Sequence, residues 1–269
     1  MAQLSAHRGH ADELRGLLIH LILPPLGVAT LFIGWYAVAS AGVISHQFLP
    51  TPLVVLDKII DLTRVPYSGA LLQTHLFSSL EKFGVGYLLA ACLGVPLGLL
   101  LGRFQVLEWA LSPLLEAARF IPPIAWVPFS ILWIGTGFLS PVLVIFSGVF
   151  FTCVVNSYIG AKLADKALLE AAQTLGVGRW LGLTEVLLPA ALAHIVAGLR
   201  IGAGFGWQSL IGAELIVGST GLGYMIVQGE SNLNAPVVIA GMVTIGVVGA
   251  LIDYVMRRIE YRIYRKWRR

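Results

Sequence analysis

Two charged residues beside a predicted helix break are the first candidates for chemistry. Glu116 and Arg119 are three residues apart, and Pro122 and Pro123 follow after two further residues, in a long apolar stretch. A guanidinium at such a break could face a polar passage through the apolar region and attract an anion. The same spacing also fits an ordinary ion pair between residues i and i+3 of one helix. Both interpretations stay open from the sequence.

Glu214 is a further charged residue in an apolar stretch, toward the end of a predicted helix over residues 191–217. Its carboxylate could line or gate the same passage, or it could be a hydrogen-bonded packing residue. Arg200 precedes it by 14 residues, about 21 Å along a helix, so the two cannot pair within one copy of the chain. The candidates for lining the passage are Arg119, Glu214, Trp207 and Gln208.

Glu116, Arg119 and Glu214 would also be the catalytic candidates of a membrane-embedded enzyme, but no His-rich or Ser/His/Asp grouping accompanies them. The chain has no GxxxxGK motif followed by Ser or Thr, so it cannot bind ATP in that way. Cys92 and Cys153 lie in apolar runs without Cys or His at metal-ligand spacing, which favours inert buried thiols. The sequence therefore predicts no catalytic residue, no metal site and no cofactor bound by this chain.

The composition is that of an integral membrane protein. Hydrophobic residues make up 57% of the 269 positions and charged residues only 12%, whereas soluble domains carry roughly 25% charged residues. The net charge of +4 could indicate nucleic acid binding, but seven of the 18 Lys and Arg residues lie within positions 257–269, directly after an apolar stretch. A basic segment at that place is typical of the cytoplasmic anchor of a membrane span.

The intervals between charges predict where the chain crosses the membrane, because a charged side chain at the bilayer centre costs about 2.5–3.5 kcal/mol. The first interval could be a secretory signal, but residues 17–35 exceed the roughly 7–15 residues of a signal core, so we expect a retained span. Residues 120–161 contain no charge and must hold two helices, with a reversal at Gly135. The predicted spans are residues 17–41, 83–101, 107–134, 141–159, 191–217 and 237–256.

Other segments are predicted around these spans. Residues 46–80 contain proline breakers and an amphipathic pattern too short to span, which indicates a helix at the membrane surface. The two prolines named above interrupt the third span. Residues 218–236 are expected to form a connector of turns. The fifth span carries a small-residue stripe for close helix packing, at Gly198, Gly202 and Gly206.

An even number of spans places both ends of the chain on one side of the membrane. If residues 1–16, Arg103, the segment 162–190 and the basic tail 257–269 are cytoplasmic, thirteen Lys and Arg residues lie on that side. The opposite side then has only Lys58, Arg64 and Lys82. Positive residues accumulate in cytoplasmic loops, so the N-terminus and the C-terminus are both predicted to be cytoplasmic.

Residues 170–189, EAAQTLGVGRWLGLTEVLLP, carry charges between the long apolar runs of the C-terminal part. The apolar residues of positions 166–175 share one helical face, Gly176 ends that helix, and a second short helix is expected over residues 179–187. Apolar side chains exposed beside a membrane need a partner, and Glu170 adds a charge that could pair with it. The alternative is an ordinary loop packed on the helices.

The spacing of this stretch resembles the EAA loop of the permease subunits of ATP-binding-cassette (ABC) importers. Glu170, Ala171 and Ala172 are followed at the same spacing by Gly176 and by Pro189. The resemblance implies that the loop contains a coupling helix, which docks in a groove of an ATPase subunit. The residues to which it assigns this role are Glu170, Ala171, Ala172, Leu175 and Gly176.

Further segments resemble the branch of these permeases that carries nitrate, sulfonates, taurine and bicarbonate. They are FLPTP at residues 48–52, the runs at 79–102 and 198–216, IPPIAWVPFSILWIGTG at 121–137, and GLGYMI at 221–226. This branch implies an all-α polytopic membrane protein, a six-helix transmembrane bundle with the type I ABC importer permease fold, over residues 17–256. Importers of aromatic, pyrimidine or riboflavin-type nutrients share much of the pattern, so the resemblance does not name the solute.

The resemblance implies a transport subunit that performs no covalent chemistry. Such a permease forms the pathway for a small anionic solute across the bacterial inner membrane. It works as a homodimer with two ATPase subunits, which bind ATP and Mg, and with an external substrate-binding protein; nucleic acid is not an expected partner. An ion-driven secondary transporter is the other transport alternative, but no inverted repeat is visible between the two halves.

Overall fold

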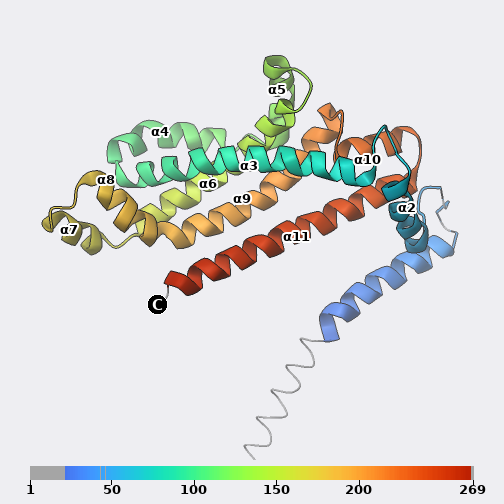
Figure 1. Ribbon diagram of the computed structural model, residues 1–269, viewed down its shortest axis with the longest axis horizontal. Helices are drawn as coiled ribbons and strands as arrows, with labels where there is room; N and C mark the ends of the chain where they lie inside the picture. Colours follow the sequence, from blue (N-terminus) through green and yellow to red (C-terminus); the bar gives the residue numbers. More distant parts are fainter. Residues whose placement is uncertain (1–21, 43, 46, 268–269) are drawn as a thin grey trace, which may run out of the picture.

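The computed structural model describes residues 22–42, 44–45 and 47–267, which fold into an elongated set of helices (Figure 1). The first described helix, Ile22–Ser40, extends away from the bundle and is mostly exposed. Residues 17–21 of the first predicted span, the predicted segment 1–16 and positions 268–269 lie outside the described residues. The short helix predicted between the first two spans is present as α2 (Pro52–Arg64).

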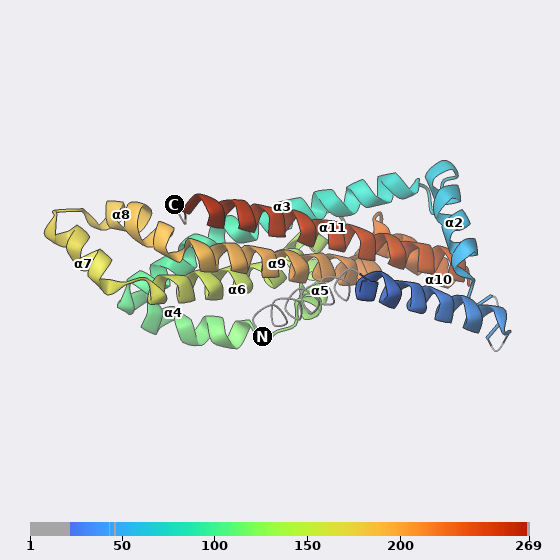
Figure 2. The same cartoon turned by 90° about the horizontal axis from the view of Figure 1, so that it is seen from below.

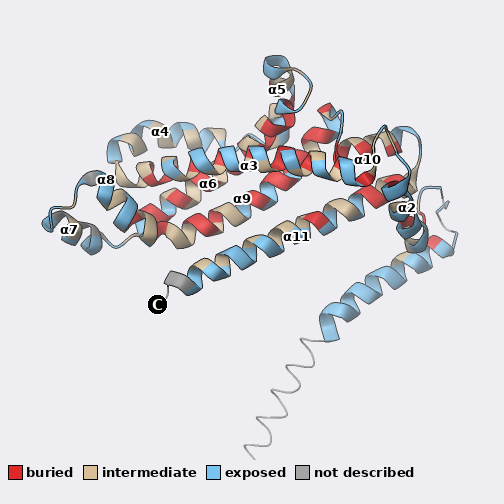
Figure 3. Cartoon of the chain, in the orientation of Figure 1, coloured by how far each residue is buried: buried red, intermediate tan, exposed pale blue. Residues whose placement is uncertain are grey.

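The centre of the bundle is α6 (Leu139–Leu163), which packs along both α3 (Leu72–Arg103) and α9 (Leu188–Val217). Helix α11 (Ala235–Trp267) runs along α9 on the other side from α6 (Figures 1 and 2). Buried residues concentrate on α6 and α9, whereas the outer helices are largely exposed (Figure 3). The all-α prediction is confirmed.

Small residues let α3, α6 and α9 approach one another closely. A Cβ added at Gly94 of α3 would lie 2.9 Å from Cys153 Cβ, and one added at Gly206 of α9 would lie 2.5 Å from Val149 Cγ2. The stripe predicted on α9 is therefore a packing surface, as expected from its spacing. A second stripe on α3 was not predicted from the sequence; it consists of Gly86, Ala90, Gly94, Gly98 and Gly102.

We expect Gly98→Ala to destabilise the bundle and Gly84→Ala to leave it intact. A methyl group at Gly98 would overlap the carbonyl oxygen of Val154, which cannot rotate away, so α3 and α6 must separate at a cost of about 1–3 kcal/mol. The same group at Gly84, in the same helix, meets nothing within 4 Å, and alanine there gains up to ~1 kcal/mol of helix propensity. Thermal unfolding in detergent compares the two variants; equal midpoints would contradict the close α3–α6 contact.

The third predicted span is broken where its two prolines stand. Helix α4 (Gln105–Ala118) ends before them, a 3-10 turn (Pro123–Trp126) follows, and α5 (Val127–Ile134) continues at an angle of 92°. Proline lacks a backbone N–H and cannot continue the preceding helix, but it is tolerated in a first turn. Five described helices are long and apolar enough to cross a membrane, and the bent pair makes a sixth if it counts as one broken span.

The start predicted for the second span was wrong, because Lys82 does not mark a water-facing boundary. Helix α3 begins at Leu72 rather than at residue 83, and Lys82 lies inside it with only 3% of its surface exposed. The ammonium group is tolerated there because it pairs with the Glu214 carboxylate at 2.9 Å.

Two predicted segments near the C-terminus contain more helix than the sequence led us to expect. The connector of turns contains a ten-residue helix, α10 (Leu222–Ser231), whose apolar side chains pack into the core. The last helix, α11, does not end at residue 256 but continues through the basic tail to Trp267. Its charged part remains helical beside α9 because Arg200 of α9 pairs with two acidic residues of α11, Asp253 and Glu260.

Candidate functional site

The stretch with the Glu-Ala-Ala pattern forms one end of the molecule, opposite to α2 and α10 (Figures 1 and 2). It comprises α7 (Lys166–Thr174), α8 (Arg179–Gly182) and a π-helical turn (Leu183–Leu187) that leads into α9. The predicted arrangement of a helix, a glycine turn and a second helix is present.

Local hydrogen bonds define both ends of α7. The Asp165 side chain accepts a hydrogen bond from the Ala167 N–H at 2.9 Å, as an N-cap residue does. At the other end Gly176 adopts φ +79°, and the Val177 N–H donates to the Ala172 carbonyl at 3.0 Å. This is the Schellman pattern, which favours glycine because its central residue is left-handed. The turn therefore depends on Gly176.

Large apolar side chains are exposed around this turn. Leu175 is 82% exposed and Trp180 is 75% exposed, and Leu168 and Leu181 are also exposed. Glu170 and Ala171 lie on the exposed part of α7. A group of large apolar side chains that the rest of the chain leaves exposed marks an interaction site. We call this the coupling surface, after the role that the sequence resemblance predicts for it, and it consists of Leu168, Glu170, Ala171, Leu175, Trp180 and Leu181.

The coupling surface is connected firmly to the bundle. Leu187, at the end of the π-helical turn, is buried against a small core that includes Leu99 of α3, Ala161 of α6 and Ala191 of α9. From Trp180 to Val217 the chain is continuously helical, through α8, the π-helical turn and α9. A displacement of the coupling surface would therefore be passed to α9 and its neighbours, because packed interiors transmit strain.

Arg119 lies at the break between α4 and α5 and is exposed. It lines two neighbouring cavities: one of about 650 Å³ between α4 and α6, and one of about 430 Å³ between residues 119–123 of the break, α6 and α9. Its guanidinium lies over the Phe120 ring, 5.1 Å from the ring centre. In the described part of the chain no ion pair joins it to Glu116, so the simple i, i+3 pair is not formed.

The other three passage candidates have different environments. Gln208 is exposed. Trp207 is 5% exposed; its indole N–H donates to the Ile245 carbonyl at 3.2 Å, and its ring meets Phe83 edge-on. Glu214 is 1% exposed and bonded within the subunit. Internal partners favour the packing alternative for Glu214, and Trp207 also has its partners inside the bundle.

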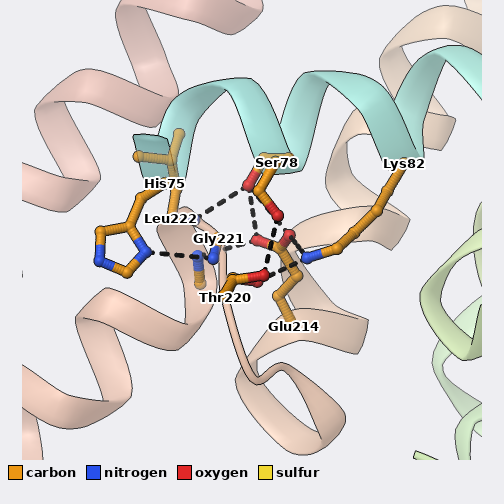
Figure 4. A network of polar contacts seen from close by, with 9 residues as sticks. His75, Ser78, Lys82, Glu214, Thr220, Gly221 and Leu222 are labelled. Atoms are coloured by element: carbon orange, nitrogen blue, oxygen red, sulfur yellow. Dashed lines mark hydrogen bonds and ion pairs between the residues drawn. The ribbon is translucent and has the colours of Figure 1, made fainter. Parts of the chain in front are cut away.

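Glu214 belongs to a buried polar network, which we call the Lys82–Glu214 cluster: His75, Ser79, Lys82 and Glu214 (Figure 4). The Lys82 Nζ and the Ser79 hydroxyl both donate to the Glu214 carboxylate, at 2.9 Å and 2.8 Å. The Gly223 N–H donates to the same carboxylate at 3.1 Å. The charge is thereby neutralised and hydrogen-bonded on several sides, as a buried carboxylate requires.

The same cluster holds the loop between α9 and α10. The Lys82 Nζ donates to the Thr220 carbonyl, the Gly221 N–H donates to His75 Nδ1 at 3.2 Å, and the Leu222 N–H donates to the Ser79 hydroxyl at 2.9 Å. Three residues of α3 therefore bind three consecutive residues, Thr220 and Gly221 of the loop and Leu222 at the start of α10, which Figure 4 labels. The cluster fixes the end of the molecule opposite the coupling surface.

Sequence comparison identifies the family. The model of the binding-protein-dependent transport system inner membrane component family matches residues 94–269. The chain belongs to this family. It is a permease subunit of an ABC importer rather than an enzyme, as are the relatives that it resembles.

Three relatives of the permease are named for the solutes that they carry. The taurine transport system permease protein TauC of Escherichia coli is 34% identical, over 88% of this chain and 86% of TauC. The putative aliphatic sulfonates transport permease protein SsuC of Bacillus subtilis is 34% identical, over 94% of this chain and 88% of SsuC. The nitrate import permease protein NrtB of Synechocystis is 29% identical, over 89% and 88%.

Solved structures confirm the fold of the permease. Inward-facing conformations of the MetNI methionine ABC transporter align with TM-scores of 0.62 and 0.64 at 22% identity. The first alignment covers 70% of this chain and 93% of the solved chain. The permease therefore has the type I ABC importer fold that the sequence led us to expect.

Sequence reasoning missed Lys82 as a partner of Glu214 in the permease. A signal was present, since His75, Ser79 and Lys82 follow one another at spacings of four and three and therefore share one face of a helix. Treating Lys82 as the edge of a span concealed this pattern.

Proposed function

We propose that this permease forms the translocation pathway of an importer for a small sulfonate, taurine-like or nitrate-like anion across the inner membrane. Relatives named for these solutes match nearly the whole chain, which supports this substrate class. The exposed Arg119 beside two cavities supports an anionic solute, because a guanidinium binds oxyanions through several donors at once.

The coupling surface is the observation that carries the proposal. In this account Leu175 and Trp180 insert into a groove of an ATPase subunit, the small Ala171 and Ala172 permit close approach, and Glu170 pairs with a basic residue of that subunit. Gly176 shapes the turn between the two short helices. Movement of the ATPase subunits enters the bundle here and is passed through Leu187 to α9.

The working assembly contains two copies of the permease, two ATPase subunits and an external substrate-binding protein. One copy supplies half of a pathway, and the exposed apolar side chains of the projecting α5, Leu132 and Trp133, are available to a second copy (Figure 1). ATP and Mg are bound by the ATPase subunits. Their closure draws the two coupling surfaces together, and the helices tilt to open the pathway to alternate sides.

We place the coupling surface, the N-terminus and the C-terminus on the cytoplasmic side. The distribution of Lys and Arg supports this orientation. Because Lys82 is buried in the bundle, the opposite side keeps only Lys58 and Arg64 of the three basic residues first assigned to it. The charge difference that supports the orientation is therefore larger than the sequence alone indicated.

Reconstitution tests the proposed function. The permease, its ATPase and its binding protein are incorporated into proteoliposomes, and uptake of labelled taurine, an alkanesulfonate, nitrate and a pyrimidine is measured with and without ATP. We expect ATP-dependent uptake of at least one of the three anionic or sulfonated solutes. Uptake of the pyrimidine alone would contradict the proposed anionic substrate class. Uptake driven by an ion gradient without ATP would contradict the proposal that transport depends on the ATPase subunits.

A further inference from the structure

The two cavities beside Arg119 have different chemical character. The smaller one is lined by neutral polar side chains of α6, including Thr152 and Asn156. The larger one is lined by two carboxylates of α4, Glu108 and Glu116. Arg119 lines both, so one guanidinium stands between a neutral polar cavity and an acidic one. Both volumes fall within the roughly 300–1,000 Å³ of small-molecule sites.

Only one of the two carboxylates is available to a ligand. Glu108 accepts hydrogen bonds from the Lys162 Nζ at 2.6 Å and from the Tyr158 hydroxyl at 2.5 Å. Glu116 has no hydrogen bond or ion pair with any residue that the structure describes, and it is exposed at the cavity. Its charge is therefore free to meet a cation.

The smaller cavity offers hydrogen-bond donors and no carboxylate. One N–H of the Asn156 amide donates to the Thr152 carbonyl at 2.9 Å, which leaves its second N–H free. Arg119 lines the same cavity, so the cavity presents both a guanidinium and this N–H as donors to the oxygens of an anionic group. Glu116 of α4 and Arg119, the residue that follows the last residue of α4, lie about one helical turn apart.

We propose that these cavities bind a zwitterion that joins a strongly acidic group to an ammonium group, of the aminoalkanesulfonate type, as it passes through the membrane. The acidic group lies against Arg119 and Asn156, and the ammonium group lies against Glu116. A simple anion of the same size would gain the first contact and be repelled at Glu116. The inference rests on the proposed function and narrows its substrate class.

Equilibrium binding to the purified permease–ATPase complex, without the binding protein, tests this inference. The probes are taurine and ethanesulfonate, which differ by the ammonium group, and the complex is held in phosphatidylcholine nanodiscs. We expect taurine to bind about ten-fold more tightly. Glu116→Gln should abolish this preference while leaving ethanesulfonate binding unchanged or improved, and Arg119→Gln should weaken both. Glu230→Gln, an exposed carboxylate on α10 at the other end of the bundle, is the matched control and should retain the preference.

Equal binding of the two probes, no measurable binding, or a preference that survives Glu116→Gln would overturn the inference. A lipid headgroup with a primary ammonium and a phosphate has the same chemistry, whereas the trimethylammonium of phosphatidylcholine has no N–H to donate, so the measurement is repeated with phosphatidylethanolamine. Taurine binding that persists supports the solute site, and binding lost in that lipid would assign the site to a headgroup instead. Failure of the proposed function is seen separately, as absent ATP-dependent uptake by the wild-type transporter.

Discussion

Replacement of Glu214 by alanine is expected to lower the free energy of unfolding of the permease by about 3–5 kcal/mol, because the Lys82 ammonium group would remain buried without its counter-charge. Lys82 is almost fully buried and has its carboxylate partner at 2.9 Å. The Ser79 hydroxyl and the Gly223 N–H would lose the same acceptor. The expected result is a large drop in the yield of folded protein and in its thermal midpoint.

A double variant separates the lost charge pair from a general loss of packing. Lys82→Met together with Glu214→Leu removes both charges at similar volume, so it should recover most of the stability that Glu214→Ala loses. Glu230→Ala changes an exposed carboxylate and should stay within about 0.5 kcal/mol of the wild type. If Glu214→Ala unfolds at the wild-type temperature in detergent, the buried pair does not stabilise this end of the bundle.

Charge reversal on the coupling surface, Glu170→Arg, is expected to abolish ATP-dependent uptake while the permease remains folded. Glu170 is exposed on α7, and its side chain has no role in the hydrogen bonds that form the turn at Gly176. The variant should therefore unfold like the wild type. A like charge placed opposite a basic residue of the ATPase costs several kcal/mol of binding, enough to reduce docking at least ten-fold.

Uptake is normalised to the amount of folded permease, so that a folding defect is not counted as a coupling defect. Leu175→Ala tests the apolar half of the same surface, since truncation of an interface side chain that fills a pocket costs about 2 kcal/mol or more. Full uptake by both variants would mean that α7 is an ordinary exposed helix.

Much of the fold could be predicted because lipid imposes simple rules. Because charged residues avoid the bilayer, the uncharged intervals located most of the helices. Because proline ends a helix, the break between α4 and α5 lies where Pro122 and Pro123 predicted it. The glycine turn of the coupling surface was also predictable, because Gly176 is needed for its left-handed conformation.

The errors came where tertiary contacts outweigh these rules. Lys82 is tolerated inside a helix only because Glu214, 132 positions later, comes to meet it. The basic end of α11 stays helical beside α9 because Asp253 and Glu260 pair with Arg200. Neither partnership is visible in local sequence, since each joins residues of separate helices.

The surroundings of Arg119 also could not be predicted from the sequence. Proximity to a proline break indicated that the guanidinium could face a passage, but the local ion pair with Glu116 was the favoured alternative. The choice between them depends on how α4 packs against α6 and on the cavities that this packing leaves.

The most direct test of the coupling assignment is the amount of ATPase subunit that co-purifies with tagged permease. Wild-type permease and the Glu230→Arg control, altered at the opposite end of the bundle, are expected to retain the ATPase in equal amounts. Glu170→Arg is expected to retain a tenth or less. Equal recovery of the ATPase with Glu170→Arg and with the wild type, or no recovery with any of the three, would contradict the assignment of this surface as the site where ATP-driven force enters the permease.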